Sequence, residues 1–386
     1  MNLKRMVRRF PLVSRMAKKL RMPLGRAYMT MCHRVHGVDR KTVFFSSFVG
    51  KSYSDSPRYI CEALMQLRPD IRVVWQLNEN ASGRDRLPKN AERVPAHSLK
   101  ALKAMSTASV IVDNFNRPFY MLKFPDQYYI QTWHGDRGFK KCLYDMENGQ
   151  EFPDYKFMDL GLAGSDFGEG VYRTAFRYPG EVMKVGMPRN DILLNPDETV
   201  ARQTRKALGI EDGVRILLYA PTFRNQNVSY KMVANIDLVR LRETLESVTG
   251  EKWICLARGH SSNTGVDAAG ALDVSSYPEM AELLLISDMF ITDYSSGISD
   301  FLLLKRPLLL FQPDRADFQQ DDRAFYFDMD ASPFPIAKSM DEVLKLVQDL
   351  PALAAAHDAI CQFYGVHESG TSAMQIAQRI SDRIPR

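Results

Sequence analysis

Apolar residues along this 386-residue chain fall into short, nearly continuous runs that alternate with amphipathic stretches. Such runs are typical of parallel strands buried on both faces, and the stretches between them are typical of helices. The first half of the chain predicts a helix at residues 57–67 and strands at residues 41–48, 71–77, 110–112, 128–132, 160–163 and 182–185. The second half predicts helices and strands in the order 215–220 (strand), 236–248 (helix), 253–257 (strand), 279–286 (helix), 289–292 (strand), 297–304 (helix) and 307–311 (strand). The pattern therefore predicts an α/β protein.

A polar stretch at residues 188–213 separates the two alternating halves, and we interpret it as the link between two domains. Two such halves predict two doubly wound domains that face one cleft. The expected boundaries are an N-terminal arm at 1–38, a first domain at 39–200 and a second domain at 201–386.

The arm differs from the rest of the chain in its charge. It contains ten Lys and Arg residues and no acidic residue, whereas the remainder has 41 basic and 46 acidic residues. Its apolar residues recur at helical spacing, which predicts one apolar stripe opposite a basic face: Leu3, Met6, Val7, Phe10, Val13, Ala17, Leu20 and Leu24. Pro11 is expected to kink this helix or divide it into two. We expect it to lie in the headgroups of an anionic leaflet; the alternatives are packing on the body, a transit peptide or an RNA-binding arm.

Several classes of protein are excluded by what the sequence lacks. No apolar run approaches the roughly 20 residues that cross a bilayer, and the arm has no uninterrupted apolar segment typical of a secretory signal. We therefore expect a peripheral protein on the cytoplasmic face of the cell membrane. Five widely spaced cysteines without a C-x-x-C pair argue against disulfides and a zinc site. There is no P-loop or dinucleotide fingerprint and no metal-binding motif.

Polar, cationic and small residues follow four of the predicted strands, at the edge where ligands bind in open α/β sheets. They are Trp133, His134, Gly135 and Asp136 after the first of these strands, Pro221, Thr222 and Arg224 after the second, Arg258 and His260 after the third, and Asp293, Ser295 and Ser296 after the fourth. His134 is a candidate general base, and Arg224 and Arg258 could bind phosphate oxygens through two N–H groups. Ser295 and Ser296 precede a predicted helix, whose free N–H groups favour an anion. The four loops together predict a phosphate-handling cleft.

The same loops belong to a series of ordered motifs that resembles the CDP-glycerol glycerophosphotransferase family, which includes polymerases and primases of teichoic-acid-type polymers. The motifs are Phe45-Ser46-Ser47-Phe48, Gly50-Lys51-Ser52-Tyr53-Ser54-Asp55-Ser56-Pro57, Val112-Asp113-Asn114, Gln131-Thr132-Trp133-His134-Gly135, Gly186-Met187-Pro188-Arg189-Asn190-Asp191, Tyr219-Ala220-Pro221-Thr222-Phe223-Arg224 and Ile291-Thr292-Asp293-Tyr294-Ser295-Ser296, followed by Asp300-Phe301 and Lys305-Arg306-Pro307. The resemblance covers most of the chain from about residue 42 onward.

This resemblance implies a GT-B-like fold of two Rossmann-like domains, with the acceptor on the side of residues 39–200 and the CDP-activated donor bound by residues 201–386. It also implies transfer of glycerol phosphate from CDP-glycerol to a hydroxyl of a membrane-linked glycan or polyol-phosphate acceptor, with release of CMP, in the synthesis of teichoic-acid-like or capsular polymers. The alternative within the family is a ribitol-phosphate transferase that uses CDP-ribitol. No cofactor is firmly implied; a divalent cation such as Mg²⁺ is compatible with the chemistry, but no motif for it is present.

The resemblance also implies roles for individual residues. His134 would take the proton of the acceptor, and His260 with Arg258 would contact the donor phosphates. The other residues expected to bind substrate are Trp133, Gly135, Asp136, Arg189, Pro221, Thr222, Arg224, Thr292, Asp293, Ser295, Ser296 and Asp300. Two positions depart from the family pattern. Asp136-Arg137 stands where the family usually has Thr-Pro, and Ser261 stands where it usually has Pro.

Two functions outside this reaction remain as alternatives. The same fold class could support a nucleotide-sugar glycosyltransferase, which would transfer a sugar in place of a polyol phosphate. A non-catalytic, membrane-bound scaffold is the other alternative, and the Asp136-Arg137 departure is its support. Nucleic acid is not expected as a partner. The sequence does not predict the acceptor, the oligomeric state or whether the enzyme primes or polymerises.

Overall fold

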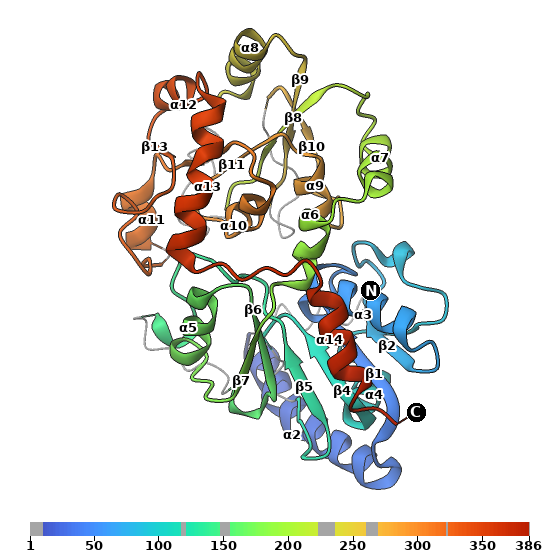
Figure 1. Cartoon of the computed structure of the whole chain (residues 1–386). Helices are drawn as coiled ribbons and strands as arrows, with labels where there is room; N and C mark the ends of the chain where they lie inside the picture. Colours follow the sequence, from blue (N-terminus) through green and yellow to red (C-terminus); the bar gives the residue numbers. More distant parts are fainter. Residues whose placement is uncertain are drawn as a thin grey trace. The chain divides into compact units, whose positions relative to one another are not determined.

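The computed structural model describes residues 11–116, 121–146, 155–222, 236–259, 269–321 and 323–385. In these residues the chain forms two β-sheets of parallel strands with helices packed against them (Figure 1). The predicted α/β class with two parallel sheets is confirmed.

The first sheet has seven strands in the order β3-β2-β1-β4-β5-β6-β7. Their bounds are β1 Asp39–Ser46, β2 Arg72–Gln76, β3 Glu92–Val94, β4 Ala108–Asp113, β5 Tyr128–Gln131, β6 Leu160–Ala163 and β7 Glu181–Lys184. Phe45 of β1 pairs with Trp75 on one side and with Val112 on the other. All six strands predicted in this half are present, and β3, which is three residues long, is additional.

The second sheet has six strands in the order β10-β9-β8-β11-β12-β13. Their bounds are β8 Arg215–Tyr219, β9 Trp253–Ala257, β10 Ala271–Asp273, β11 Met289–Thr292, β12 Leu308–Phe311 and β13 Ile336–Ala337. The four strands predicted here form its centre, and the short edge strands β10 and β13 were not predicted. Edge strands have one neighbour to pack against, so their apolar pattern is weak.

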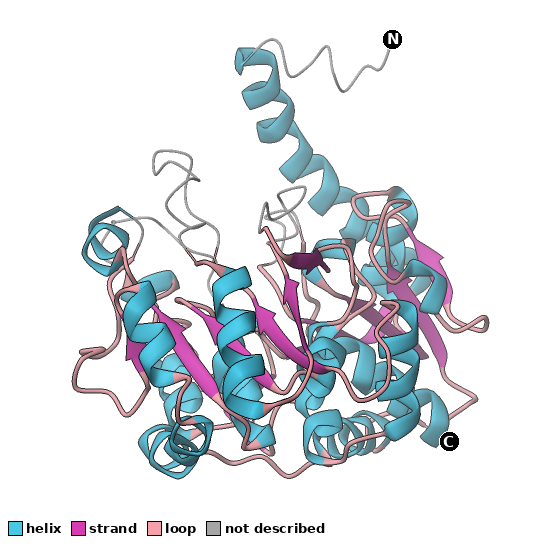
Figure 2. Cartoon of the chain, turned by 90° about the horizontal axis from the view of Figure 1, so that it is seen from above, coloured by secondary structure: helices cyan, strands magenta, loops and turns pink. Residues whose placement is uncertain are grey.

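The helices surround these sheets as Figure 2 shows. Their bounds are α2 Pro11–His36, α3 Asp55–Leu67, α4 Leu99–Thr107, α5 Asp166–Thr174, α6 Asp191–Leu194, α7 Glu198–Ala207, α8 Leu238–Thr249, α9 Met280–Ile286, α10 Gly297–Phe301, α11 Arg315–Asp321, α12 Met340–Leu346, α13 Leu350–Tyr364 and α14 Ser372–Ser381. The predicted helices correspond to α3, α8, α9 and α10, and α10 passes directly into the 3₁₀ turn Leu302–Leu304.

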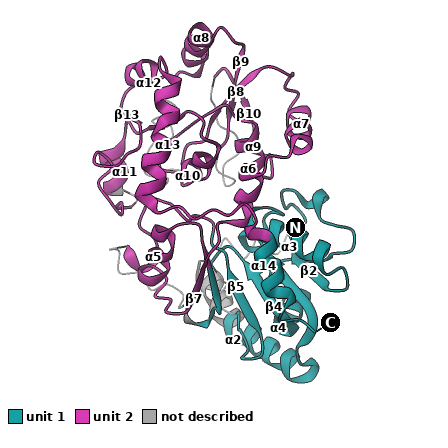
Figure 3. Cartoon of the chain, in the orientation of Figure 1, with its two compact units in different colours: residues 1–133, 153–161, 374–386 teal, residues 134–152, 162–373 magenta. Residues whose placement is uncertain are grey.

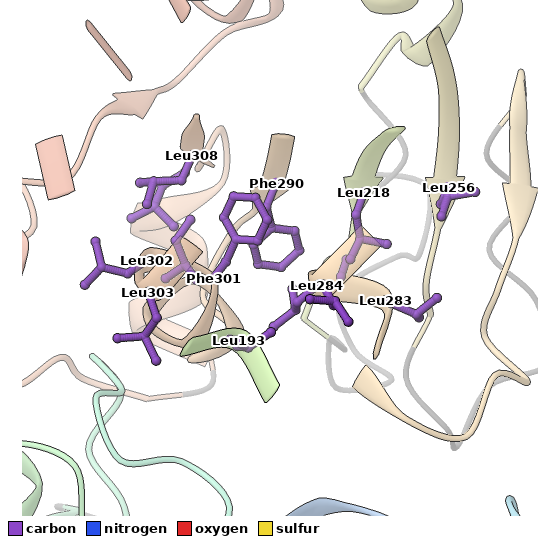
Figure 4. Packing of buried hydrophobic residues seen from close by; sticks show 14 of the residues in the cluster. Leu193, Leu218, Leu256, Leu283, Leu284, Phe290, Phe301, Leu302, Leu303 and Leu308 are labelled. Atoms are coloured by element: carbon purple, nitrogen blue, oxygen red, sulfur yellow. The ribbon is translucent and has the colours of Figure 1, made fainter. Parts of the chain in front are cut away.

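Both faces of the second sheet are buried, which explains why its strands are continuously apolar. Neighbouring residues of a strand point to opposite faces. On one face, Leu218 and Phe290 pack with Leu284 of α9 (Figure 4). On the other face, Leu217 and Ile291 pack in a second cluster that includes residues of α8.

Contacts divide the chain into two compact units that are discontinuous in sequence (Figure 3). Unit 1 consists of residues 1–133, 153–161 and 374–386, and unit 2 consists of residues 134–152 and 162–373. Two hydrogen bonds connect the C-terminal residues to the rest of unit 1: Arg68 Nη2 donates to the Pro385 carbonyl (2.9 Å) and Arg68 Nη1 donates to Ser381 Oγ (3.3 Å). The domain boundaries expected at residues 38 and 200 stay a prediction. The two contact units have other bounds, because each consists of separate segments of the chain.

The described part of the arm is a single helix, α2, that begins at Pro11 and contains Pro23 (Figure 2). Proline is well tolerated at the first position of a helix, where its missing N–H has no partner to lose. Near its C-terminal end, α2 is anchored by the buried side chains of Met29 and Cys32. The part of the predicted stripe before Pro11 lies outside the described residues. Within the described ranges, no helix has both the length and the apolar character needed to cross a membrane.

The five cysteines all lie in described segments, and none of them is paired with another in the structure.

Candidate active site

Three neighbouring strands of the second sheet end side by side, at the edge where the sequence predicts ligand binding. Arg258, directly after β9, donates its backbone N–H to the Tyr219 carbonyl of β8 (2.9 Å). Ala220, directly after β8, donates its N–H to the Ile291 carbonyl of β11 (3.1 Å). The loops after β8, β9 and β11 therefore start next to one another, as predicted.

The loop after β8 is tied to the loop after β11 through Thr292 and Asp293. Asp293 Oδ1 accepts a hydrogen bond from the Thr222 N–H (2.8 Å), and Thr292 Oγ1 donates one to the Ala220 carbonyl (2.6 Å). Both side chains are buried, so they hold the backbone at this edge in one shape. Pro221 and Thr222 lie beside them and are half-buried.

The α10 loop (residues 293–297) connects β11 to α10 and contains Ser295 and Ser296, which are half-buried. Ser295 Oγ accepts a hydrogen bond from the Gly297 N–H (3.2 Å). The base of the loop is fixed by Gln312, whose Nε2 donates to the Asp293 carbonyl (2.9 Å). The loop thus presents two hydroxyls from a rigid support.

Arg258 is a half-buried cation at the same edge of the sheet. Its Nη1 atom is shielded from solvent and finds no hydrogen-bond partner among the described residues. Burial lowers the pKa of Arg258, and the carboxylate of Glu279 partly offsets this effect. A guanidinium N–H group that is shielded from solvent and has no hydrogen-bond acceptor is costly unless an anion binds to it. The chemistry of this position therefore favours a phosphate or a similar anion.

The His134 loop (residues 134–138) lies beside the α10 loop. It begins after Trp133, which has a left-handed backbone conformation (φ 54°) and whose N–H donates to Gln131 Oε1 (2.9 Å). A Cβ atom placed on Gly135 would lie 3.3 Å from Ser296 Oγ, so the backbone of Gly135 passes close to that serine. His134 is half-buried. The loop that contains the predicted base thus passes next to one of the predicted phosphate-binding hydroxyls, within unit 2.

A buried ionic network includes two residues of the His134 loop. We define the network as three carboxylates and two guanidiniums: Asp136, Arg137, Arg189, Asp300 and Glu368. Arg137 Nη1 lies 2.7 Å from Glu368 Oε1 and 3.3 Å from Asp136 Oδ2, and Arg137 Nη2 lies 3.4 Å from Asp300 Oδ1. Arg189 Nε donates to Asp300 Oδ2 (3.1 Å).

The charges of this network are stabilised by one another. Burial raises the pKa of Asp136 and of Glu368, and the guanidinium of Arg137 opposes that rise. Although burial disfavours its charge, the carboxylates of Glu368, Asp136 and Asp300 raise the pKa of Arg137 overall. Buried charges that are paired in this way hold a defined geometry, and removing one partner is costly.

Three residues that were expected to bind substrate have their charged groups paired inside the network: Asp136, Arg189 and Asp300. Asp136 accepts hydrogen bonds from the Gly164 N–H (2.9 Å) and Ser165 Oγ (2.9 Å), and its side chain is 1% exposed. The carboxylate of Asp300 faces Arg137 and Arg189. Direct contact of these residues with substrate stays a prediction, and their surroundings indicate that they hold other groups in place. His260 and Arg224 lie outside the described residues.

Glu368 is the member of the network that sequence reasoning missed. It follows α13 in a polar segment without a strand pattern or a recognisable motif. Its contact with Arg137 joins residues 231 positions apart, which no local signal reveals. Arg137 was noted as a departure from the family pattern but received no role.

Among the described residues, no group of three or more His, Cys, Asp or Glu side chains is arranged to hold a metal ion.

Residues 27–382 match the family described as CDP-glycerol:poly(glycerophosphate) glycerophosphotransferase. The chain belongs to this family. This glycerophosphotransferase-family chain is 31% identical over 412 residues to the teichoic acid poly(glycerol phosphate) polymerase of Bacillus subtilis (strain 168), with 98% of the chain and 53% of that protein covered. It is 27% identical over 364 residues to the teichoic acid ribitol-phosphate primase of Bacillus spizizenii (strain ATCC 23059 / NRRL B-14472 / W23). This similarity covers 89% of the chain and 92% of that protein.

A structural comparison agrees with the family assignment. The glycerophosphotransferase-family chain is similar to the wall teichoic acid polymerase TagF in a structure of a variant soaked with CDPG, with a TM-score of 0.80 and 29% identity. This similarity covers 96% of the chain and 98% of the TagF chain, and it confirms the GT-B-like fold. The chain spans about half the length of the Bacillus subtilis relative.

Proposed function

We propose that this chain is a CDP-glycerol glycerophosphotransferase. It transfers glycerol phosphate from CDP-glycerol to a hydroxyl of a membrane-linked glycan or polyol-phosphate acceptor and releases CMP. Family membership and the similarity to a polymerase named for poly(glycerol phosphate) support this proposal.

In the proposed reaction, His134 takes the proton from the acceptor hydroxyl. The acceptor oxygen forms a bond to the β-phosphorus of the donor, the bond from that phosphorus to the bridging oxygen breaks, and CMP leaves with the electron pair. Positioning and charge stabilisation dominate phosphoryl transfer, so the protein needs a fixed base and fixed phosphate-binding groups. Arg258, Ser295 and Ser296 are our candidates for the latter, with His260 contributing from outside the described residues.

The observation on which this proposal rests is the proximity of the His134 loop to the α10 loop, at 3.3 Å between a Cβ on Gly135 and Ser296 Oγ. This proximity supports a site in which His134, the residue before Gly135, acts beside the predicted phosphate-binding serines. The unused, buried Nη1 of Arg258 at the end of β9 supplies positive charge at the same edge of the second sheet.

For the acceptor, we propose residues 39–200 as the binding side. In the first sheet the strand order reverses between β1 and β4, and ligands of open α/β sheets bind at such a point. The turn after β1 is held there by the Phe48 N–H, which donates to Asn114 Oδ1 after β4 (2.9 Å). Phe48 and Val49 both have positive φ angles, a costly conformation that is concentrated at functional sites.

The experiment that tests the reaction is CMP release by the purified chain. CDP-glycerol and CDP-ribitol are supplied in parallel, with anionic liposomes that contain a lipid-linked glycan extract. Release from CDP-glycerol, together with phosphorus in the product, supports the proposal. A product that contains a transferred sugar and no added phosphorus contradicts it, as does the absence of both CMP release and donor binding.

The second candidate is transfer of ribitol phosphate from CDP-ribitol, because a relative of similar length is named as a ribitol-phosphate primase. The same assay separates the two donors. Release from CDP-ribitol alone would establish this candidate and overturn the glycerol assignment while leaving the reaction class in place.

We also propose that α2 and the residues before it bind an anionic membrane surface on the cytoplasmic side, where a lipid-linked acceptor would be met. The side chains of Leu24 and Val35 are 67% and 70% exposed, although both are apolar. Arg26 and Arg34 are exposed on the same helix. Exposed apolar side chains beside basic ones are typical of a helix that lies in the headgroup region.

Deleting residues 2–21 is expected to weaken binding to anionic liposomes by at least about tenfold, because it removes eight basic residues and each contributes about 1 kcal/mol near such a surface. The deletion stops before Met29 and Cys32, whose side chains are buried, so the body is expected to stay folded. Co-sedimentation with anionic and neutral liposomes measures the effect. Equal binding of the full and shortened chains to anionic liposomes would contradict a membrane role for the arm.

A further inference from the structure

The His134 loop is attached to α10 at two points, both made by Arg137. The backbone carbonyl of Arg137 accepts a hydrogen bond from Ser299 Oγ (2.7 Å), and its Nη2 atom donates to Asp300 Oδ1 (3.4 Å). Ser299 and Asp300 belong to α10, which begins immediately after Ser295 and Ser296. Arg137 therefore links the segment that contains the proposed base to the segment that contains the proposed phosphate-binding serines.

The opposite side of the Arg137 guanidinium is held by two other parts of the chain. Its Nη1 atom donates to the Gly164 carbonyl (3.0 Å) after β6 and to Glu368 Oε1 (2.7 Å) after α13. Glu368 is itself fixed, because it accepts hydrogen bonds from Asn190 Nδ2 (2.9 Å) and from the Met187 N–H (3.0 Å). The Arg137 side chain is fully buried and that of Glu368 is 2% exposed, so solvent does not replace these contacts.

The space around Glu368 leaves little freedom for the carboxylate. A Cβ on Gly164 would lie 2.5 Å from Glu368 Oε1, and one on Gly186 would lie 2.4 Å from Glu368 Oε2. Two glycines thus allow the backbone to approach both oxygens. Glu368 is enclosed by the chain on both sides and points its charge at Arg137.

We propose that Glu368 and Arg137 are positioning residues, which set the distance between His134 and the α10 loop and thereby control the rate of glycerophosphate transfer. This inference rests on the proposed function. Neither side chain contacts the reacting atoms in this proposal; Glu368 acts by fixing Arg137, and Arg137 fixes the loop. A displacement of about 1 Å of a catalytic group can lower a rate by about 100-fold, so loss of the contact between Glu368 and Arg137 is expected to lower turnover strongly.

The test is Glu368→Gln, which keeps the size of the side chain and removes its charge. We expect kcat for CMP release to fall by about 10- to 100-fold, as for a small displacement of a catalytic group. The KM for CDP-glycerol is expected to stay within about threefold, because the described contacts of Glu368 are with Arg137, Met187 and Asn190, none of which is a proposed donor-binding group. Calorimetric titration with CDP-glycerol checks separately that donor binding is retained.

Asp191→Asn is the matched control. Asp191 is a partly buried carboxylate that accepts hydrogen bonds from the N–H groups of Ser372 (3.0 Å) and Ala373 (2.7 Å). Among the described residues, the partners of its carboxylate lie in the segment that follows Glu368, so Asp191 shares that segment with Glu368 but not the contact with Arg137. If Glu368 acts merely by holding that segment, both variants lose kcat together, in proportion to the fall in melting temperature. The proposal expects a loss of kcat in Glu368→Gln and none in Asp191→Asn.

Arg137→Lys gives a second, independent measurement. It keeps the positive charge but loses the planar fork that reaches Gly164, Glu368 and Asp300 at once. We expect a folded variant with a kcat at least as low as that of Glu368→Gln and an unchanged KM. A wild-type kcat in a folded Glu368→Gln variant overturns the inference and leaves the proposed function intact. A wild-type chain that neither binds CDP-glycerol or CDP-ribitol nor releases CMP from them overturns the proposed function, and the inference with it.

Discussion

Replacing His134 with alanine is expected to lower CMP release from CDP-glycerol by about 100- to 10,000-fold, the usual contribution of a general base. The loss should appear in kcat, because the imidazole acts on the acceptor proton in the transition state. His134 lies in a half-buried loop outside the two hydrophobic clusters of the second sheet, so we expect the melting temperature to change little. Initial rates of CMP release and a thermal unfolding curve of the same sample measure both effects.

His357→Ala is the matched control for this experiment. His357 is a histidine of the same unit with a side chain that is 14% exposed, and it lies on α13, where its Nδ1 contacts Asp358 Oδ1 (2.8 Å). Removing it deletes an imidazole of comparable exposure without affecting the His134 loop, and we expect wild-type turnover. A folded His134→Ala variant that retains wild-type activity would exclude His134 as the base.

Replacing Arg258 with methionine is expected to lower kcat/KM for CDP-glycerol by about 100-fold, as for the removal of one preorganised donor to a charged oxygen. Its effect on stability should be small, because two contributions oppose each other. Burial lowers the pKa of Arg258 and Nη1 lacks a partner among the described residues, so removing the guanidinium relieves a cost. The buried carboxylate of Glu279, however, loses a nearby positive charge. We therefore expect a melting temperature close to that of the wild type.

Arg306→Met provides the comparison, because Arg306 is also a half-buried arginine of unit 2 whose pKa is lowered by burial. Its Nη1, in contrast, donates to the Leu285 carbonyl (2.8 Å) and the Ser287 carbonyl (2.6 Å). It precedes β12 and so lies at the opposite edge of the sheet from Arg258. Loss of these bonds should destabilise the chain by about 1–3 kcal/mol and leave kcat/KM unchanged. If Arg258→Met shows the same pattern as Arg306→Met, Arg258 is structural and does not bind the donor.

Strands buried on both faces were well predicted from the sequence because burial imposes a visible pattern. β9 and β11 have the predicted bounds. In β11, Phe290 and Ile291 lie on opposite faces of the sheet, and each packs in a buried hydrophobic cluster, so the strand is apolar throughout. The helices α12 and α13, which follow residue 311, were not predicted. α13 has an apolar, alanine-rich composition without a clear polar face, so its periodicity is weak.

The sequence by itself determined the α/β class, the central strands, the residues at their ends and the family. These depend on local composition and on spacing, which a chain displays before it folds. Tertiary structure decided how the charged residues are used. Asp136 and Asp300 looked like substrate ligands by position, yet their carboxylates face Arg137 and Arg189 inside the protein. Glu368 completes that network from a segment 231 residues beyond Arg137. A buried ion pair needs an opposite charge at hydrogen-bond distance, and such distances between remote segments are set by packing, which leaves no trace in local sequence.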